Sequence, residues 1–390
     1  MIFYTKQHQY YCGIDLHEKN MYICIADQSG KIRYHQNLRT SREEFLAAVA
    51  PYREDICVGI ESTYAWYWLA DLCSDEGITF ILGHALYLKA VHGGKTKNDK
   101  IDSKKLAFIL RGGNFPIAYV YPRKMRSTRD LLRRRMYLMR KRSAVLTHIQ
   151  NTNSQYNLGP FPKKLSYRSN RSGVADRFTD QSVRKTVEVD LHLLDFYDEL
   201  LRDLELYILK AARVDDSISL HLLQTIPGIG KILSLVMMYE IEDIRRFKRV
   251  QEFLSYSRLI KCPRESGGKK YPSKNSKIGN VHLKWAFSEA AVLFLRGNER
   301  IKRKHNRRVS KYGKAKALSI LASDLGRAVY FMLRRKEPFD MNKFLGAGNA
   351  SQTPNRTAEG ETLIQAAKIK CIQECQTAAV RQSPRVPCVD

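Results

Sequence analysis

Residues 10–27 have the sequence YYCGIDLHEKNMYICIAD, in which two apolar runs, Tyr10–Ile14 and Met21–Ala26, flank a short polar segment. A turn-forming stretch, DQSG at residues 27–30, leads to a third run at Lys31–Leu38. Short apolar runs separated by turn residues are typical of antiparallel strands. The sequence therefore predicts a three-stranded antiparallel meander.

After the meander the pattern alternates between helix and strand. We expect a helix over Ser41–Val49, where Ser41 and Glu44 have the spacing of a capping box. The expected elements that follow are a strand at Ile56–Ile60, a helix at Trp66–Ser74, a strand at Ile78–Leu82 and a helix at about Ile101–Leu110. This order is typical of a ribonuclease-H-like α/β domain, which we place at residues 8–120.

Residues 121–216 predict a basic helical connector. Long helices are expected at Arg126–Gln150 and Val187–Lys210, separated by a loop at Asn157–Val174 that is rich in Gly, Pro, Ser and basic residues. In the second helix, apolar residues follow the spacing of a coiled-coil seam: Val187, Leu194, Tyr197, Leu201, Leu204 and Ile208. The helices form either an antiparallel hairpin or a coiled coil between chains, and the sequence does not choose between them.

Residues 217–340 predict a mostly helical C-terminal domain. It has helices at about 281–296 and 314–335 and a helix-hairpin-helix-like turn, PGIG, at residues 227–230. After Phe339 the composition becomes polar and aperiodic, which predicts a disordered tail over residues 341–390.

The charge of the chain indicates its partners. Lys and Arg number 67 against 39 Asp and Glu, a net charge of +28, and this excess is spread over most of the 390 residues. Such a distribution favours nucleic acid over a membrane surface. No apolar run approaches the roughly 18 residues of a membrane span, and the N-terminus lacks a secretory apolar core. The eight cysteines have no zinc-module spacing, which predicts buried free thiols in a reducing cytoplasm.

Four carboxylates form the first candidate site. Asp15 and Glu61 end apolar strands, and Asp99 and Asp102 project from one face at the start of a helix. Such residues can converge at one sheet edge and hold Mg²⁺ against a phosphodiester. His17 and Glu18 beside Asp15 are either further ligands or the solvated start of a turn. Alternatively, Asp15 starts a turn, and Asp99 and Asp102 are ordinary first-turn acids, although the basicity of the chain favours the metal site.

A serine in a glycine-rich stretch is the second candidate. Ser266 precedes two glycines, which predicts an exposed hydroxyl that can act as a nucleophile. Ser273 and Ser276 are nearby alternatives, and a glycine-rich surface turn without chemistry is the simpler interpretation. Lys269 and Lys270 can hold a phosphate. A predicted phosphate-binding track continues from them through Lys274, Lys277, Asn280 and Lys284.

Two further features predict nucleic-acid contacts. The glycines Gly228 and Gly230, with Lys231, precede an apolar helix and can hold a backbone phosphate, although many helix N-termini look alike. The first long helix is almost single-signed, with only Asp130 opposing, and repels itself unless a polyanion lies on it. A solvated face is the alternative for its eight basic residues: Arg126, Arg129, Arg133, Arg134, Arg135, Arg140, Lys141 and Arg142.

Six segments in this order resemble the DEDD-type insertion-sequence transposases, relatives of the Piv-type DNA invertases. They are GIDLHEKNMYICIAD, IESTYAWYWLADLC, KNDKIDSKKLAFILRGG, LLQTIPGIGKILS, ESGGKKY and KIGNVHLKWAFSEAA. The resemblance extends over residues 10–340. One departure concerns the Thr-Gly pair that many members have soon after the glutamate, because Thr63 is followed here by Tyr64.

The resemblance implies a RuvC-like nuclease fold in which Asp15, Glu61, Asp99 and Asp102 bind Mg²⁺, with Mn²⁺ as an alternative. It also implies that Ser266 attacks DNA and forms a covalent phosphoserine intermediate. Family members are guided by a structured RNA that pairs with donor and target DNA. They act as dimers or tetramers in which the acidic site of one subunit completes the serine site of another.

The expected function is therefore that of an insertion-sequence transposase or site-specific recombinase acting on element ends and target DNA. One alternative is a RuvC-like junction-resolving nuclease that uses the four acids and water. The other is a non-catalytic nucleic-acid-binding protein.

Overall fold

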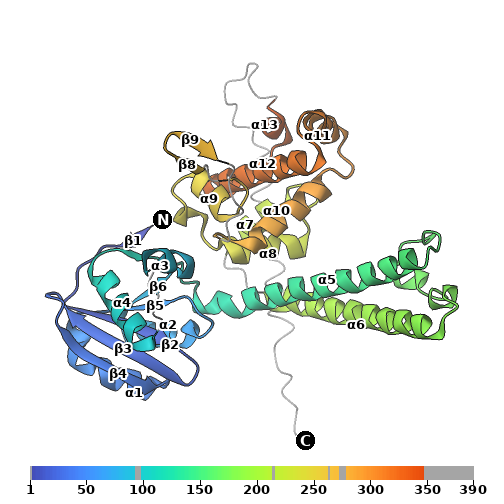
Figure 1. Cartoon of the computed structure of the whole chain (residues 1–390). Coiled ribbons are helices and arrows are strands. Elements are labelled where there is room, and N and C mark those ends of the chain that lie inside the picture. The colour runs from blue at the N-terminus through green and yellow to red at the C-terminus, as the bar shows by residue number, and fades with distance from the viewer. Residues whose placement is uncertain (1, 93–97, 213–215, 262–263, 272–277, 347–390) are drawn as a thin grey trace, which may run out of the picture. The chain divides into compact units, whose positions relative to one another are not determined.

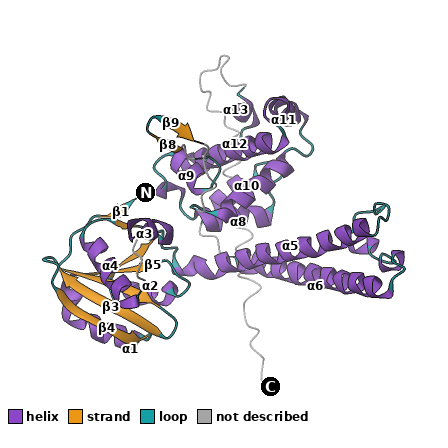
Figure 2. Ribbon diagram, viewed as in Figure 1, coloured by secondary structure: helices purple, strands orange, loops and turns teal. Residues whose placement is uncertain are grey.

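The structure, a computed structural model, describes residues 2–92, 98–212, 216–261, 264–271 and 278–346. Met1–Phe339 forms one compact unit, and the chain from Asp340 onward belongs to another. Strands gather in the N-terminal part, whereas the rest of the described chain is mostly helical (Figure 2).

A five-stranded sheet with the order β4-β3-β2-β5-β6 organises the N-terminal part (Figure 1). The strands β2 (Tyr10–Leu16), β3 (Asn20–Asp27) and β4 (Ile32–Arg39) pair antiparallel, which confirms the predicted meander. The strands β5 (Ile56–Glu61) and β6 (Thr79–Gly83) extend the sheet in parallel with β2.

Helices cover both faces of this sheet. One core contains side chains of α1 (Arg42–Val49) and α2 (Trp66–Asp75), and a second contains side chains of α3 (Ala85–His92) and α4 (Asp99–Arg111). The N-cap prediction for α1 is confirmed, because the Ser41 side chain accepts a hydrogen bond from the backbone N–H of Glu44. The helix α3 was not predicted. The remaining elements of this part are β1 (Phe3–Tyr4), the 3-10 helix η1 (Ala50–Asp55) and β7 (Phe115–Pro116).

Two long helices, α5 (Arg123–Gln155) and α6 (Gln181–Ala211), pack against each other within the chain. They run antiparallel, because Arg135 near the start of α5 pairs with Glu205 near the end of α6. Of the two arrangements that the sequence left open, the hairpin within the chain is therefore present. The predicted seam is confirmed by four buried side chains of α6 at seven-residue intervals: Val187, Leu194, Leu201 and Ile208.

The connection between these helices is a loop, as predicted, and it packs on the hairpin. It contains two short 3-10 turns, η2 (Arg168–Asn170) and η3 (Ala175–Arg177), and it adds Leu165 and Val174 to the core of the hairpin. Arg171 is buried and lies 2.5 Å and 2.6 Å from carboxylate oxygens of two acids on α6, Asp195 and Asp198. The stretch is folded because its basic and apolar side chains find partners on α6, far along the sequence.

The C-terminal part is mostly helical, as predicted. Its elements are α7 (Ser217–Gln224), α8 (Lys231–Ile241), η4 (Ile244–Arg246), α9 (Val250–Tyr256), β8 (Arg264–Ser266), β9 (Lys269–Tyr271), α10 (Val281–Phe294), α11 (Glu299–Tyr312) and α12 (Lys314–Arg335). The helix α11 was not predicted.

The start of the expected disordered tail also differs, because Met341–Leu345 forms the short helix α13. The rest of that tail lies outside the described residues. No helix among those that the structure describes is long and apolar enough to cross a membrane. The cysteines Cys12, Cys24, Cys57 and Cys73 are buried free thiols, as predicted, and the other four lie outside the described residues.

Candidate active site

Asp15 and Glu61 lie at the ends of neighbouring parallel strands. The register of β2 and β5 pairs Ile14 with Ile60, so Asp15 and Glu61 are the next residue on each strand. Ile14 and Ile60 belong to the core on the α1 and α2 face. Because successive side chains of a strand point to opposite faces, both carboxylates are directed to the α4 face.

A glycine brings α4 against this face. A Cβ atom on Gly13 would lie 2.2 Å from the backbone N of Ala107 and 2.3 Å from the backbone O of Ser103. Only glycine permits this approach of the α4 backbone to β2. The ring of His35 on β4 lies 2.9 Å from the backbone O of Lys100, which fixes the first turn of α4 on the sheet. That turn carries Asp99 and Asp102.

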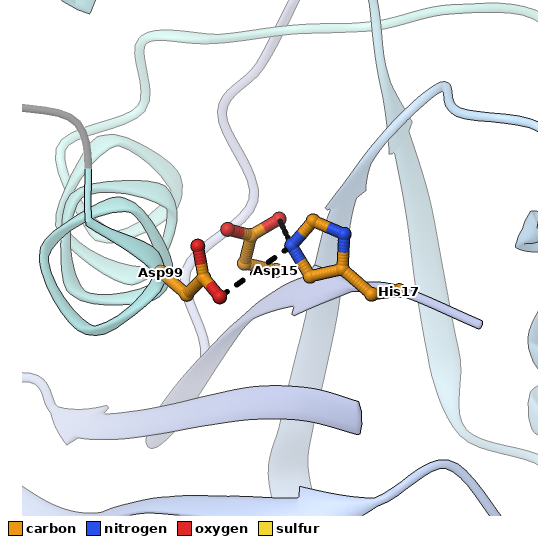
Figure 3. Close-up of side chains that lie close together, drawn as sticks. All are labelled: Asp15, His17 and Asp99. Atoms are coloured by element: carbon orange, nitrogen blue, oxygen red, sulfur yellow. Dashed lines mark ion pairs between the residues drawn. The ribbon is translucent and has the colours of Figure 1, made fainter. Parts of the chain in front are cut away.

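Three side chains converge where β2 ends and α4 begins (Figure 3). The Nε2 atom of His17 lies 3.5 Å from Oδ1 of Asp15 and 3.7 Å from Oδ2 of Asp99. One ligand atom from each residue lies within 4.8 Å of the other two, a spacing that allows them to hold one metal ion. The side chain of Asp15 is 21% exposed, whereas those of His17 and Asp99 are more than half exposed.

The electrostatics of this cluster suit a cation. Burial raises the pKa of the Asp15 carboxyl, the nearby His17 ring lowers it, and the charges of Asp99 and Asp102 raise it again, so that the pKa stays above its ordinary value. Asp102 is therefore close enough to Asp15 to repel it. A bound divalent cation would offset this repulsion between the carboxylates.

The structure thus brings together Asp15 and Asp99, with Asp102 on the same turn of α4. Glu61 lies on the adjacent strand and the same face, but outside the cluster of three potential ligands. His17, for which the sequence left a ligand role open, lies inside that cluster, whereas Glu18 is exposed. Sequence could not place the His17 ring, because it lies one residue beyond the end of β2.

Ser266 lies in a separate hairpin. The strands β8 and β9 pair Ser266 with Lys269 across a two-residue turn formed by Gly267 and Gly268. Both glycines have positive φ, +56° and +71°, as hairpin turns of this length require. Ser266 and Lys269 are exposed, and Ser266 does not belong to the metal-ligand cluster found among the described residues. The side chain of Lys270, and all of Lys274 and Lys277, lie outside the described part of the chain.

The predicted PGIG turn lies between α7 and α8. Gly228 has φ +88°, and a Cβ atom there would lie 2.8 Å from the backbone C of Leu293 and 2.9 Å from the backbone N of Phe294. Gly228 therefore permits close packing of the turn against α10. Gly230 and Lys231 are exposed at the start of α8, where no side chain caps the helix.

The eight basic residues of α5 predicted to contact nucleic acid divide into two groups. Five of them pair with carboxylates of other elements at N–O distances between 2.5 Å and 3.0 Å: Arg126 with Asp71, Arg129 and Arg133 with Glu240, Arg135 with Glu205, and Arg142 with Asp198. For these five residues the carboxylates supply the counter-charge within the protein. The self-repulsion that predicted a polyanion along the whole helix is thus removed at these positions. Arg126 and Arg129 are also buried, so they do not present a surface to nucleic acid.

The second group consists of Arg134, Arg140 and Lys141, which are exposed. Arg134 and Lys141 flank the ring of Tyr137, at 4.9 Å and 5.5 Å from its centroid. These three residues remain candidates for nucleic-acid contacts. Trp66, by contrast, is buried in the core, and the Arg126 guanidinium lies 4.6 Å from its ring centroid.

Sequence reasoning missed Glu240, an acid inside the otherwise apolar helix α8. Its side chain is 3% exposed, and besides Arg129 and Arg133 it accepts a hydrogen bond of 2.7 Å from Nδ2 of Asn280. Asn280 also caps α10 by accepting hydrogen bonds from two of its backbone N–H groups. Glu240 therefore joins α5, α8 and the start of α10, the helix that follows the serine-containing segment. Because Asn280 is buried, its prediction as part of a phosphate-binding track is wrong.

Comparisons with known proteins agree with this arrangement of the chain. Residues 12–157 match a family model described as a transposase of the DEDD type found in IS110. Residues 220–306 match the model of the transposase IS116/IS110/IS902 family. The transposase for insertion sequence element IS1111A of Coxiella burnetii (strain RSA 493 / Nine Mile phase I) is 22% identical over 341 residues, which cover 84% of this chain and 90% of that relative.

Proposed function

Because the chain belongs to the IS110 family of DEDD transposases, we propose that it recombines DNA by a covalent route. In this proposal Asp15, Glu61, Asp99 and Asp102 hold Mg²⁺ in a RuvC-like domain, and Ser266 supplies the nucleophile. The observation that carries the proposal is the convergence of Asp15 and Asp99 at the end of β2, which depends on the close approach of α4 to Gly13.

The residues at this site fit a divalent metal. Carboxylate oxygens are the ligands of Mg²⁺, which retains several waters, and the family implies a divalent metal. A nitrogen ligand from His17 suits Mn²⁺ as well. When bound, the metal polarises the phosphodiester. The carboxylates themselves position it at the open edge of the sheet, where Asp99 is accessible to a substrate.

Ser266 is suited to nucleophilic attack. The Gly267-Gly268 turn leaves its side chain exposed, and Lys269 is its partner across the hairpin, where an ammonium group can hold the phosphate. The Ser266 Oγ–P bond forms as the P–O bond to one DNA strand breaks, and the hydroxyl proton passes to solvent or to the leaving oxygen. The covalent link conserves the phosphodiester energy, so a second strand can be joined without ATP.

We further propose that the chain acts as a homo-oligomer, a dimer or a tetramer, in which two copies complete each site. A second apolar stripe on α6 supports this proposal: Val189, Leu193, Phe196 and Tyr207 are between 39% and 61% exposed, and Leu200 continues their spacing. It uses the same three-, four- and seven-residue steps as the buried seam, and much of its surface is exposed on the hairpin. A coiled-coil contact with a second copy would cover it.

A guide RNA is the other proposed partner. Arg134, Arg140 and Lys141 form an exposed basic group on α5 that can bind its phosphates. The bases of the RNA, and not these side chains, would then specify the donor and target DNA.

The proposal is tested by incubating the full chain and guide RNA with element-end DNA and Mg²⁺. We expect cleavage and a denaturant-resistant protein–DNA adduct with the wild type, loss of both with Asp15→Asn, and loss of the adduct with Ser266→Ala. Ser154→Ala, at an exposed serine of α5, is the matched control and should behave as the wild type. Full cleavage by Ser266→Ala would favour a hydrolytic nuclease, and binding without any cleavage would favour a non-catalytic protein.

The oligomer is tested separately by light scattering. Phe196→Glu should dissociate the assembly, whereas Glu199→Gln, at an exposed position on the same helix, should leave it intact. A monomeric wild type would contradict this part of the proposal.

A further inference from the structure

The helix α11 carries an unusual concentration of positive charge. Its fourteen residues, ERIKRKHNRRVSKY, include seven Lys or Arg and one acid, and Ile301 is its one buried side chain. It packs against α12, which bounds it on one side. Like charges three and four residues apart destabilise a helix, so this composition needs a counter-charge.

The counter-charge found within the protein is incomplete. Lys302 pairs with Glu299 at 2.6 Å, and Arg308 pairs with Asp324 of α12 at 2.6 Å. Arg303 and Arg307 take part in no ion pair among the described residues, and both are exposed. This differs from α5, where six arginines meet carboxylates of other elements.

Three exposed cations that take part in no ion pair found among the described residues form one row. Arg303, Arg307 and Lys311 are each four residues apart, so they follow one another along α11 at intervals of about 6 Å, in a row that starts opposite Ile301 and turns by about 40° at each step. All three are exposed, and Lys314 and Lys316 extend the basic surface across the turn into α12. The row is therefore accessible and one-signed.

We propose that this row binds the phosphate backbone of duplex DNA, independently of base sequence. The inference rests on the proposed function, because the recombinase must hold DNA, and it adds the surface that does so. Single-stranded nucleic acids are held by stacking their bases on aromatic side chains. The ring of Tyr312 is 40% exposed, but Lys311 and Lys316 lie 5.3 Å and 4.9 Å from its centroid, so cations already occupy it. Arginine and lysine without a row of free aromatic rings suit a backbone contact.

The test is the salt dependence of binding to a short DNA duplex of unrelated sequence, measured with the full chain in EDTA so that no strand is cut. Each phosphate contact contributes about 0.9 to the slope of log K against log salt. The triple variant Arg303→Gln/Arg307→Gln/Lys311→Gln should therefore lower the slope by roughly 2.7. Single-stranded DNA and RNA of the same length form the comparison arms, for which we expect a smaller change.

A matched control variant distinguishes the effect of this surface on DNA binding from the effect of the net charge of the chain. The variant Lys185→Gln/Arg202→Gln/Lys210→Gln removes the same charge from exposed positions of α6 and should leave the slope unchanged. Circular dichroism checks folding. If the α11 triple variant does not fold, the single Arg307→Gln should still lower the slope by about 0.9.

The outcomes distinguish this inference from the proposed function. An unchanged slope in the α11 variant, an equal loss in the α6 control, or a loss confined to single strands overturns the inference while leaving the covalent route intact. A wild-type chain that binds no duplex contradicts both.

Discussion

Substitution of one buried glycine should disturb the candidate active site without touching any proposed ligand. In Gly13→Ala the new methyl group would lie 2.2 Å from the backbone N of Ala107, where an ordinary contact is at least 3.4 Å. Because the neighbour is the α4 backbone and not a flexible side chain, α4 must move away from β2 by about 1 Å, at a cost of about 1–3 kcal/mol for overpacking. That movement displaces Asp99 and Asp102 relative to Asp15.

The expected result is a loss of activity larger than the loss of stability explains. A misplacement of about 1 Å can reduce a rate by about 10²-fold. We therefore expect kcat/KM for cleavage of element-end DNA to fall by about that factor under conditions where urea titration shows the variant still folded. The metal concentration for half-maximal cleavage should rise as well, because Asp99 no longer faces Asp15.

Gly59→Ala is the matched control. Gly59 is the register partner of Gly13 on β5, but the nearest atoms to its added methyl group belong to the side chains of Leu110 and Phe115, at 3.0 Å and 3.1 Å. These side chains can rotate, so we expect a destabilisation of about 1 kcal/mol and nearly normal cleavage by the folded fraction. Equal activity losses in Gly13→Ala and Gly59→Ala, or normal cleavage by Gly13→Ala, would refute the idea that α4 positions the acids.

Three further outcomes concern the helical parts of the chain. Replacing the buried carboxylate in Glu240→Ala leaves Arg129 and Arg133 unpaired and should lower the free energy of unfolding by about 3–5 kcal/mol, as measured by urea titration. Burial acts to raise the pKa of Glu240, but Arg133 and Arg129 outweigh burial and leave the pKa lowered. The stability that the ionised carboxylate contributes is therefore complete above the unfolded pKa of about 4.3 and is lost as pH falls through the folded pKa. The stability of the wild type should accordingly approach that of Glu240→Gln as pH falls from about 4.3 through the lowered folded pKa, and a constant difference across pH would contradict this. In the hairpin, Leu194→Ala should cost about 2–5 kcal/mol, because this side chain is fully buried, whereas Leu193→Ala on the exposed stripe should cost the isolated chain less than about 0.5 kcal/mol in the same titration.

The sequence predicts the α/β part well because its elements are specified locally. The strands β2 to β6 follow apolar runs of the right length, and the Ser41 cap lies within three residues of the group it binds. Asp15 and Glu61 are recognisable because each directly follows an apolar strand. By contrast, the close approach at Gly13 depends on backbone atoms of Ser103 and Ala107, some ninety residues away, and no local pattern indicates it.

The packing of the loop between α5 and α6 could not be predicted for a similar reason. Its composition predicts a loop, since Gly, Pro, Ser and Asn favour turns and loops. Yet Arg171 is 5% exposed and paired with two acids of α6, and Leu165 is buried beside it in the hairpin core. Composition describes the backbone of this stretch correctly, but it does not reveal a buried arginine, which is tolerated only because its partners lie opposite.

The two basic helices show why charge alone misassigns a nucleic-acid surface. Both α5 and α11 are rich in arginine, and the sequence predicted nucleic-acid binding for α5, the longer helix. The difference lies in the elements packed against them: α5 faces Asp71, Glu205 and Glu240, whereas α11 faces α12, from which Asp324 is the acid that reaches it. A carboxylate within 3 Å already supplies the counter-charge that a phosphate would provide, so binding DNA there would require breaking an ion pair first. The cations available to a polyanion are those without such a partner, and in this protein Arg303 and Arg307 meet that condition where Arg129 and Arg133 do not.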